Sequence, residues 1–220
     1  MAIFLHHEVD KIKKNVLRLG TLVEESVKRA IYAIESNTES AAQKVIQDDD
    51  LIDSMEIEIE EECLKVLALY QPVAIDLRYI VVILKINGEL ERIGDLAVNI
   101  AERTLALAEC KKWDIPFDFR AMSTKVCEML KKSLDALINY DPTLATEVLR
   151  IDDEVDKYHR EMYSKVKNVI RSEPESLDAM IHYMTISKHL ERIADHAENI
   201  AQDVVYMIQG HIIRHRNLSG

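Results

Sequence analysis

The chain has 220 residues, of which 48% are hydrophobic, enough to build a packed core. Thirty-nine Asp and Glu against 28 Lys and Arg give a net charge of -11, and a field of that sign repels nucleic-acid phosphates and anionic lipid heads. Five glycines, four prolines and 5% aromatic residues favour long amphipathic helices over short strands, so we expect an all-α protein that binds no nucleic acid.

The N-terminal stretch and the cysteines both favour a cytoplasmic protein. The opening residues MAIFLHHEVDKIKK lack the long apolar run of a signal peptide, and no other run approaches the roughly 20 apolar residues of a membrane span. The chain has an odd number of cysteines, Cys63, Cys110 and Cys127, and no two of them have CxxC spacing. This pattern predicts reduced thiols that are buried or half-buried. We therefore expect a cytoplasmic location without direct insertion into a membrane.

Three helices are predicted in the first half of the chain. Apolar residues recur every three or four positions from Val9 to Ile34, which predicts a first helix ending near Asn37. The run NTESAA offers capping residues for a second helix, which breaks at the sequence YQP. Pro72 is expected at the opening of a third helix, which ends near Cys110 before the connector KKWDIPFDF.

The second half is predicted to repeat this plan. A fourth helix runs from Phe119 to Tyr140, and Asp141 followed by Pro142 predicts the N-cap and first turn of a fifth helix. The sequence SEPE, residues 172–175, predicts the end of that helix and a capping box that opens a sixth. The sixth helix is expected to reach about Gly210.

An internal repeat supports this reading. LERIGDLAVNIAE, residues 90–102, and LERIADHAENIAQ, residues 190–202, agree at nine of thirteen positions, and KVIQDDDLID in the first half matches EVLRIDDEVD in the second. We therefore predict two tandem pseudo-symmetric three-helix bundles with six long helices, divided into residues 1–112 and 113–220.

Acidic residues recur four positions apart in both repeats. Such pairs share one face of a helix, where like charges repel, and here they border the apolar stripes. A bound cation would relieve that repulsion, and oxygen ligands suit Mg, Ca or Mn while also accommodating Fe or Zn. The predicted metal-binding residues are Asp49, Asp53, Glu91, Asp95, Asp152, Asp156, Glu191 and Asp195.

Three further residues lie close to the same helix faces as these acids. Asn99 and Asn199 follow Glu91 and Glu191 by eight positions and are expected to support the carboxylates, and His159 offers an optional imidazole. The alternative reading is a set of solvated acids neutralised by arginines in neighbouring positions.

Other motifs give little support for catalysis. The sequence has no GxSxG, P-loop, Gly-rich dinucleotide turn or HExxH, so we do not expect an enzyme. His182, His189 and His196 step by seven along the sixth helix without counterparts in the first half, and we expect interface or surface histidines rather than ligands.

The motifs QPVAIDLRYI, LKINGELERIGDLAVNIAE and HLERIADHAENIAQ closely resemble the PhoU proteins, and the resemblance runs from the first helix to about Gly210. It implies a cytoplasmic regulator of phosphate uptake and of the phosphate-starvation response, without catalysis. The implied partners are the ATPase subunit of the ABC phosphate transporter and a phosphate-sensing histidine kinase, and the family also suggests a homodimer. In this family ExxxD and DxxxD motifs carry metal ions or clusters, which maps onto the same eight acids.

Two alternatives remain open from the sequence. Carboxylate-held cations can activate water, so a metal-dependent hydrolase or oxidase is one, and a PhoU-like partner of a non-ABC phosphate transporter is the other. The second half also departs from the first: it has EPES where the first has QPVA, and it is two residues shorter before the LER motif. The two halves can therefore differ in metal or partner binding.

Overall fold

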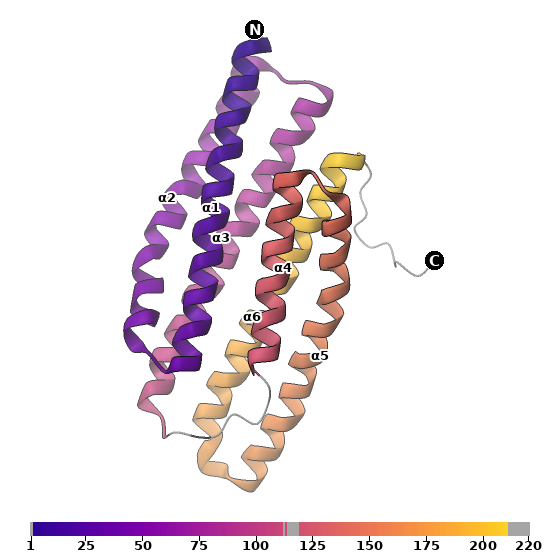
Figure 1. Cartoon of the computed structure of the whole chain (residues 1–220). Coiled ribbons are helices and arrows are strands. Elements are labelled where there is room, and N and C mark those ends of the chain that lie inside the picture. The colour runs from indigo at the N-terminus through magenta and orange to yellow at the C-terminus, as the bar shows by residue number, and fades with distance from the viewer. Residues whose placement is uncertain (1, 112, 114–118, 211–220) are drawn as a thin grey trace.

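Six long helices account for nearly all of the chain in the computed structural model, which describes residues 2–111, 113 and 119–210. The described ranges contain no strand, and the predicted all-α fold of two tandem three-helix bundles is confirmed (Figure 1). The helices are α1 (Ala2–Ser36), α2 (Glu39–Tyr70), α3 (Ala74–Glu109), α4 (Phe119–Asn139), α5 (Pro142–Ser172) and α6 (Leu177–Gln209), with the 3-10 turn η1 (Pro174–Ser176) before α6.

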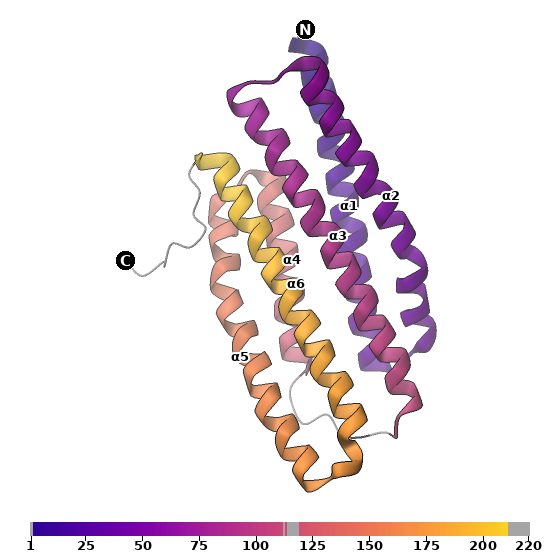
Figure 2. The same ribbon diagram turned by 180° about the vertical axis from the view of Figure 1, so that it is seen from behind.

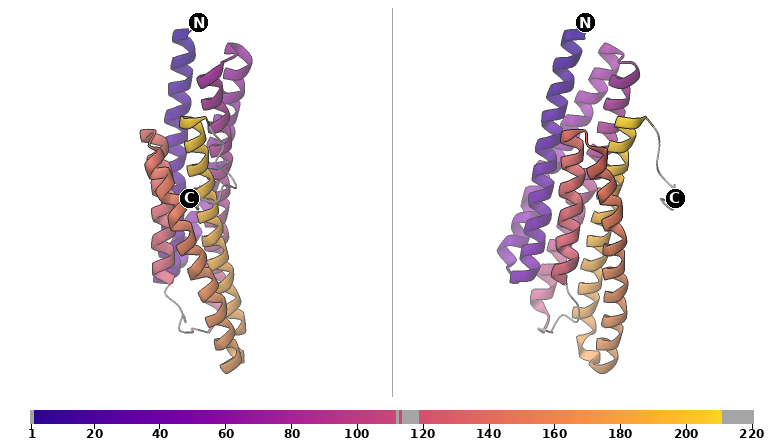
Figure 3. Two further views of the ribbon diagram at one scale, coloured as in Figure 1. Left: turned by 90° about the vertical axis from the view of Figure 1, so that its right-hand side faces the viewer. Right: turned by 45° about the vertical axis from the view of Figure 1, so that its right-hand side comes forward.

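The two bundles lie side by side and share a long interface. Helices α1 to α3 occupy one side of the molecule and α4 to α6 the other, and the view from behind shows α3 and α6 next to each other at the boundary (Figure 2). They are antiparallel, because Lys85 early in α3 contacts Asp203 late in α6. Seen from the side, the molecule is long and narrow along the helix axes (Figure 3).

One apolar core runs through both bundles. The predicted stripes supply it: Leu90 of α3 and Leu190 of α6 are both fully buried in the same cluster. Helix α1 also touches α4, where a Cβ at Gly20 would lie 2.8 Å from a methyl of Leu134, so glycine is needed for this close approach. A second, smaller cluster lies between α5 and α6 and is built on Met162, Val166 and Met180.

Most predicted helix ends agree with the structure. Asn37 follows α1 in the left-handed region at φ 50°, Cys110 is the C-cap of α3, and Gly210 is the C-cap of α6. Asp141 caps α5 as predicted, since its Oδ1 accepts hydrogen bonds from the backbone N–H groups of residues 143 and 144 at 2.8 and 3.3 Å. Local capping chemistry therefore placed these boundaries well.

Two local predictions were wrong, for Pro72 and for SEPE, and the one for NTESAA holds for the position of the N-cap but not for its hydrogen bond. Pro72 does not open α3, because α3 begins at Ala74 with Val73 as its N-cap. Thr38 stands at the N-cap of α2 but makes no capping hydrogen bond, since its hydroxyl instead lies 2.7 Å from that of Ser36. The SEPE capping box does not form either: the 3-10 turn η1 intervenes, and no side chain caps the start of α6.

Several other expectations concern the chain as a whole. No helix in the described part of the chain is both long and apolar enough to span a membrane. The three cysteines are unpaired, with Cys63 buried and Cys110 and Cys127 half-buried. The connector KKWDIPFDF lies mostly outside the described residues, as does Lys112 at the expected boundary between residues 1–112 and 113–220, which stays a prediction.

Candidate functional site

Four of the eight predicted carboxylates meet where α2 packs against α3. Asp49 and Asp53 come from α2, and Glu91 and Asp95 come from α3. Their charges act on one another: burial, followed by the charges of Asp53 and Asp95, raises the pKa of Asp49 to about 6. Burial and then the charge of Asp95 also raise the pKa values of Asp53 and Glu91. We call these four residues together with Glu56 the first acid cluster.

The packing of α2 on α3 at this place depends on a glycine. A Cβ at Gly94 would lie 3.2 Å from Cγ2 of Ile52 and 3.5 Å from Oδ1 of Asp49. The absence of a side chain therefore lets α2 come close enough to bury one oxygen of Asp49. That Oδ1 has no hydrogen-bond partner, an expensive state for a buried polar atom.

The other four predicted carboxylates meet in the equivalent place between α5 and α6. Burial, followed by the charges of Glu198, Asp195 and Asp156, raises the pKa of Asp152 to about 7. Burial and then the charge of Glu191 raise the pKa of Asp195. We call these five residues the second acid cluster.

The second acid cluster contains one acid that the sequence analysis missed. Glu198 comes from α6, and burial raises its pKa before the charges of Asp195 and Asp153 add to the effect. Glu198 aligns with Val98 of the first repeat. A carboxylate in place of an apolar residue at this aligned position is the sequence feature that could have identified it.

The second acid cluster also carries side-chain cations. Lys188 Nζ lies 2.5 Å from Glu191 Oε2, and Arg160 Nη1 lies 3.0 Å from Asp156 Oδ2. In the first acid cluster no Lys or Arg from the described residues forms an ion pair with the carboxylates. Charge compensation from within the chain is therefore partial in the second cluster and weaker in the first.

The three predicted supporting residues make different contacts. Asn99 donates its side-chain amide to the backbone carbonyl of Asp95 at 2.8 Å, so it stays beside the first acid cluster. Asn199 donates to Glu89 across the α3–α6 interface at 3.2 Å. His159 Nδ1 lies 2.9 Å from the hydroxyl of Ser187, and burial lowers the pKa of this imidazole although the charge of Glu191 raises it.

The histidines of α6 fit the interface reading best at His196. Its Nδ1 lies 2.6 Å from Oε2 of Glu89, and both side chains are nearly buried between α3 and α6. Burial raises the pKa of Glu89, but the hydrogen bonds from His196 and Asn199 outweigh it and lower the pKa. Glu89 was not predicted as a functional residue from the sequence, where its one distinguishing feature is that it aligns with His189 of the second repeat.

The donor set of both clusters fits a hard cation. The candidate ligands are carboxylate oxygens that raise each other's pKa values, and the buried Oδ1 of Asp49, which has no hydrogen-bond partner, would be satisfied by a cation. Within the described ranges, however, no group of three or more His, Cys, Asp or Glu side chains is placed to hold a metal ion. The acids are thus assembled but do not form a closed coordination shell.

Known proteins resemble this chain over nearly its whole length. A phosphate-specific transport system accessory protein PhoU homolog from Aquifex aeolicus is 37% identical over 214 residues, which cover 97% of each chain. A PhoU homolog 1 of the same description from Thermotoga maritima is 34% identical and covers 94% of this chain and 90% of its own length.

Solved structures agree with this similarity. The crystal structure of PhoU from Pseudomonas aeruginosa has a TM-score of 0.89 at 34% identity and covers 94% of this chain and 99% of its own. The phosphate transport system regulatory protein PhoU from Streptococcus pneumoniae gives 0.88 at 28% identity. The PhoU domain model matches residues 16–104 and again residues 119–204, so this chain belongs to the PhoU family.

Proposed function

We propose that this chain is the accessory protein of a phosphate-specific transport system and a negative regulator of the phosphate-starvation response. The observation that carries the proposal is the match over 97% of both chains to the Aquifex aeolicus accessory protein. Because both repeats of the PhoU domain are matched, the whole bundle and not one half would serve this role.

We further propose that the chain acts as a cytoplasmic adaptor rather than as an enzyme. Its partners would be the ATPase subunit of the ABC transporter and the phosphate-sensing histidine kinase, with a homodimer as the working form. Exposed apolar side chains at the α2–α3 turn support partner binding, since Leu69, Val73 and Ile75 are 62%, 74% and 70% exposed.

Metal ions would form part of this adaptor. The first acid cluster would hold an ion through Asp49, Asp53, Glu91 and Asp95, and the second through Asp152, Asp156, Glu191 and Asp195. Fe, Zn, Mn, Mg or Ca suits these oxygen donors. Such an ion would supply positive charge that ties α2 to α3 and α5 to α6, which would stiffen the surface presented to partners.

Binding of the purified chain to each partner tests the proposal. Interferometry would measure binding to the isolated ATPase subunit and to the cytoplasmic part of the kinase, with metal content determined by elemental analysis on the same sample. We expect binding to both partners, weakened by chelation and by Asp49→Asn with Asp95→Asn. Glu61→Gln is the matched control, because Glu61 is an exposed acid of α2 outside the cluster.

Each failure has a distinct meaning. Metal-loaded protein that binds neither partner would contradict the adaptor role. Binding to a non-ABC phosphate transporter instead would identify the alternative transporter class. Metal-dependent turnover of phosphate esters that Asp95→Asn abolishes would replace the adaptor with the hydrolase alternative.

A further inference from the structure

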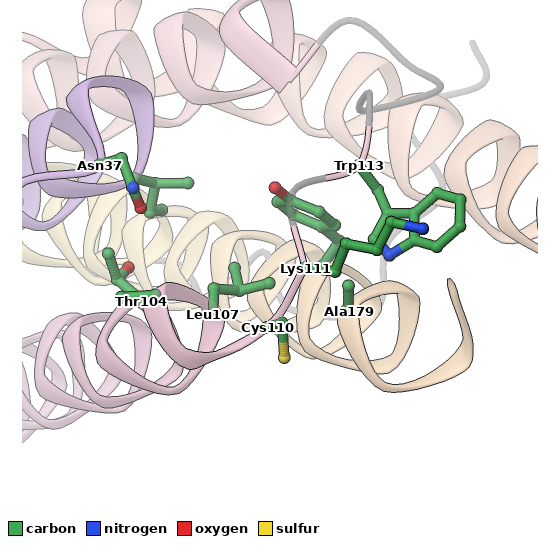
Figure 4. Close-up of a pocket in the computed structure, with 10 residues that line it drawn as sticks. Asn37, Thr104, Leu107, Cys110, Lys111, Trp113 and Ala179 are labelled. Atoms are coloured by element: carbon green, nitrogen blue, oxygen red, sulfur yellow. The ribbon is translucent and has the colours of Figure 1, made fainter. Parts of the chain in front are cut away.

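A pocket of about 460 Å³ lies where the two halves meet at one end of the molecule. It is bounded by the end of α1, the last turns of α3, the residues that follow α3 and the first turns of α6. Figure 4 shows Asn37 and Trp113 on opposite sides of the pocket, with Thr104 of α3 on the side of Asn37 and Leu107 of α3 between the two sides. Its volume falls in the range of small-molecule sites in proteins.

The pocket exists because two apolar clusters do not merge here. On one side Ile34 and Leu107 belong to the main core or pack against it. On the other side Trp113 and Tyr183 pack against the smaller cluster of Met162, Val166 and Met180. Aliphatic side chains therefore line one side of the pocket, and aromatic rings line the opposite side.

Besides Thr104 and Cys110, whose side chains donate to backbone carbonyls of α3, three polar groups of different chemistry belong to the described lining. Among the described residues neither the side-chain amide of Asn37 nor the hydroxyl of Tyr183 has a hydrogen-bond partner. Lys111 places its ammonium 4.7 Å from the centroid of the Trp113 ring, at the side of the pocket opposite Asn37 (Figure 4). The pocket thus has an amide at one end and a cation held by an indole at the other.

The charge of the pocket contrasts with the rest of the chain. None of the lining residues that the structure describes is acidic, although the chain carries 39 Asp and Glu. Among the described residues Lys111 pairs with Glu175 at 3.8 Å, and both side chains are largely exposed. An exposed ion pair of this kind is weak, so an incoming anion can replace it.

From these features we infer that the pocket binds a purine mononucleotide. An aromatic base would lie against the phenol ring of Tyr183, because every base offers a π-face to stack on. The amide of Asn37 matches the donor and acceptor edge of adenine, the pairing that Asn and Gln make with that base. The phosphate of the nucleotide would form an ion pair with the ammonium of Lys111, which lies at the end of the pocket away from Asn37.

Such a ligand would contact both halves at once. Asn37 belongs to the first half and Tyr183 to α6 of the second, so a bound nucleotide would stabilise their arrangement at this end of the molecule. Binding at this pocket is independent of the acid clusters, none of whose carboxylates lines it.

The single tryptophan of the chain makes the test direct, because Trp113 lines the pocket. AMP would be titrated into the full chain while the fluorescence of Trp113 is recorded, with calorimetry on the same samples. We expect saturable binding that Tyr183→Leu weakens about fivefold or more and Lys111→Gln about two- to fivefold. The matched control is Lys131→Gln, because Lys131 is an exposed lysine of α4 that does not line the pocket.

Competing ligands separate the parts of the site. Adenosine should bind more weakly than AMP by the same factor that Lys111→Gln costs, and inorganic phosphate alone should give no response. Asn37→Gly should remove any preference for AMP over inosine monophosphate, and glycine suits the left-handed backbone at this position.

Several results would overturn the inference. One is the absence of both a fluorescence change and heat with AMP at millimolar concentration. Another is unchanged affinity in Tyr183→Leu, with circular dichroism confirming that the variant is folded. A response to inorganic phosphate equal to that with AMP would likewise exclude a nucleotide site, as would equal losses in Lys111→Gln and Lys131→Gln.

Discussion

The two acid clusters occupy equivalent places in the two halves, but the chain neutralises them differently. In the second half Lys188 pairs with Glu191 and Arg160 pairs with Asp156. The repeat equivalents of these two cations in the first half are Gly88 and Ile57, which carry no charge. The first acid cluster therefore carries less compensating charge from described residues of the chain than the second, even though the backbone plan is the same.

The surroundings of the clusters differ in a second respect. In the first half Asn87 donates two hydrogen bonds of 2.9 Å to Glu56, one to its carbonyl and one to its carboxylate. At the equivalent place in the second half, Ser187 meets His159. An acid and an amide have thus been exchanged for an imidazole and a hydroxyl, so under the proposed metal binding the second cluster would suit a metal that accepts nitrogen better than the first.

The largest effect is expected when the shared core is damaged in either half. Leu90→Ala and Leu190→Ala each remove a fully buried side chain and should each cost about 2–5 kcal/mol of unfolding free energy. Because both residues belong to one core, unfolding in urea followed by circular dichroism should stay a single transition in both variants. Two separate transitions would mean that the halves unfold independently.

The next largest effect is expected in metal affinity, which should differ between the two halves. Asp49→Asn with Asp95→Asn should lower metal affinity by at least the roughly ten- to hundredfold that loss of an outer-shell partner causes, and Asp152→Asn with Asp195→Asn should have the smaller effect. The reason is that the second cluster already has lysine and arginine partners. Elemental analysis after dialysis against a chelator measures both, and a larger loss in the second pair would reverse the comparison.

The link between Glu89 and His196 has no counterpart under the repeat symmetry, because the equivalent residues are His189 and Leu96. His196→Ala should cost about 1–3 kcal/mol at pH 7, since it leaves a partly buried carboxylate without its main partner. His182→Ala, a half-buried histidine of the same helix, serves as the control.

The loss of unfolding free energy in His196→Ala should become smaller as the pH falls. Hydrogen bonds lower the pKa of Glu89 below its ordinary value of 4.5, so their stabilisation is present above that value and is lost as the pH falls through the lower pKa of the folded state. Chemical denaturation between pH 7 and pH 3 would show the deficit shrink, whereas a constant deficit would point to packing alone.

The raised pKa values of the acid clusters predict the opposite trend, a loss of stability as the pH rises. Asp49 and Asp152 have pKa values of about 6 and about 7 in the folded protein against 3.8, so folding favours their protonated forms. The metal-free protein should therefore lose stability relative to Asp49→Asn as pH rises from about 4 to 6, and relative to Asp152→Asn up to about 7. After solvent screening we expect on the order of 1 kcal/mol for each.

Thermal or urea unfolding at several pH values in the presence of chelator measures this trend. Glu61→Gln should show no such dependence. An advantage of Asp49→Asn that grows toward low pH would be inconsistent with an electrostatic cost at this carboxylate.

The smallest effect comes from giving the first half a cation of the second. A Cβ at Gly88 meets nothing within 4 Å, so Gly88→Ala should raise stability by up to about 1 kcal/mol through helix propensity. Gly88→Lys should add about 0.2–0.5 kcal/mol by pairing with Glu91 one turn later, and it should lower metal affinity in the first half. The difference between these two variants isolates the charge, and identical stability and metal affinity would refute its role.

Much of the fold was predictable because helix periodicity is local. The apolar stripe through Leu90 and the cap at Asp141 depend on residues within a turn or two of each other, and both agree with the structure. Pro72 and the SEPE sequence were misplaced because several neighbouring residues can start a helix, and packing selects among them. The eight carboxylates were predicted from spacing, and the structure brings them together as two groups of four, while their metal ligation stays a proposal.

The sequence by itself determined the six helices, the duplication and the faces that carry the acids, since each follows from spacing along one helix. Only the tertiary structure decided which faces meet. The approach of Asp49 to Gly94, the pairing of Glu89 with His196 and the pocket between Asn37 and Trp113 all join residues far apart in the chain. Such contacts depend on how helices dock in three dimensions, which a periodic pattern of apolar residues leaves open.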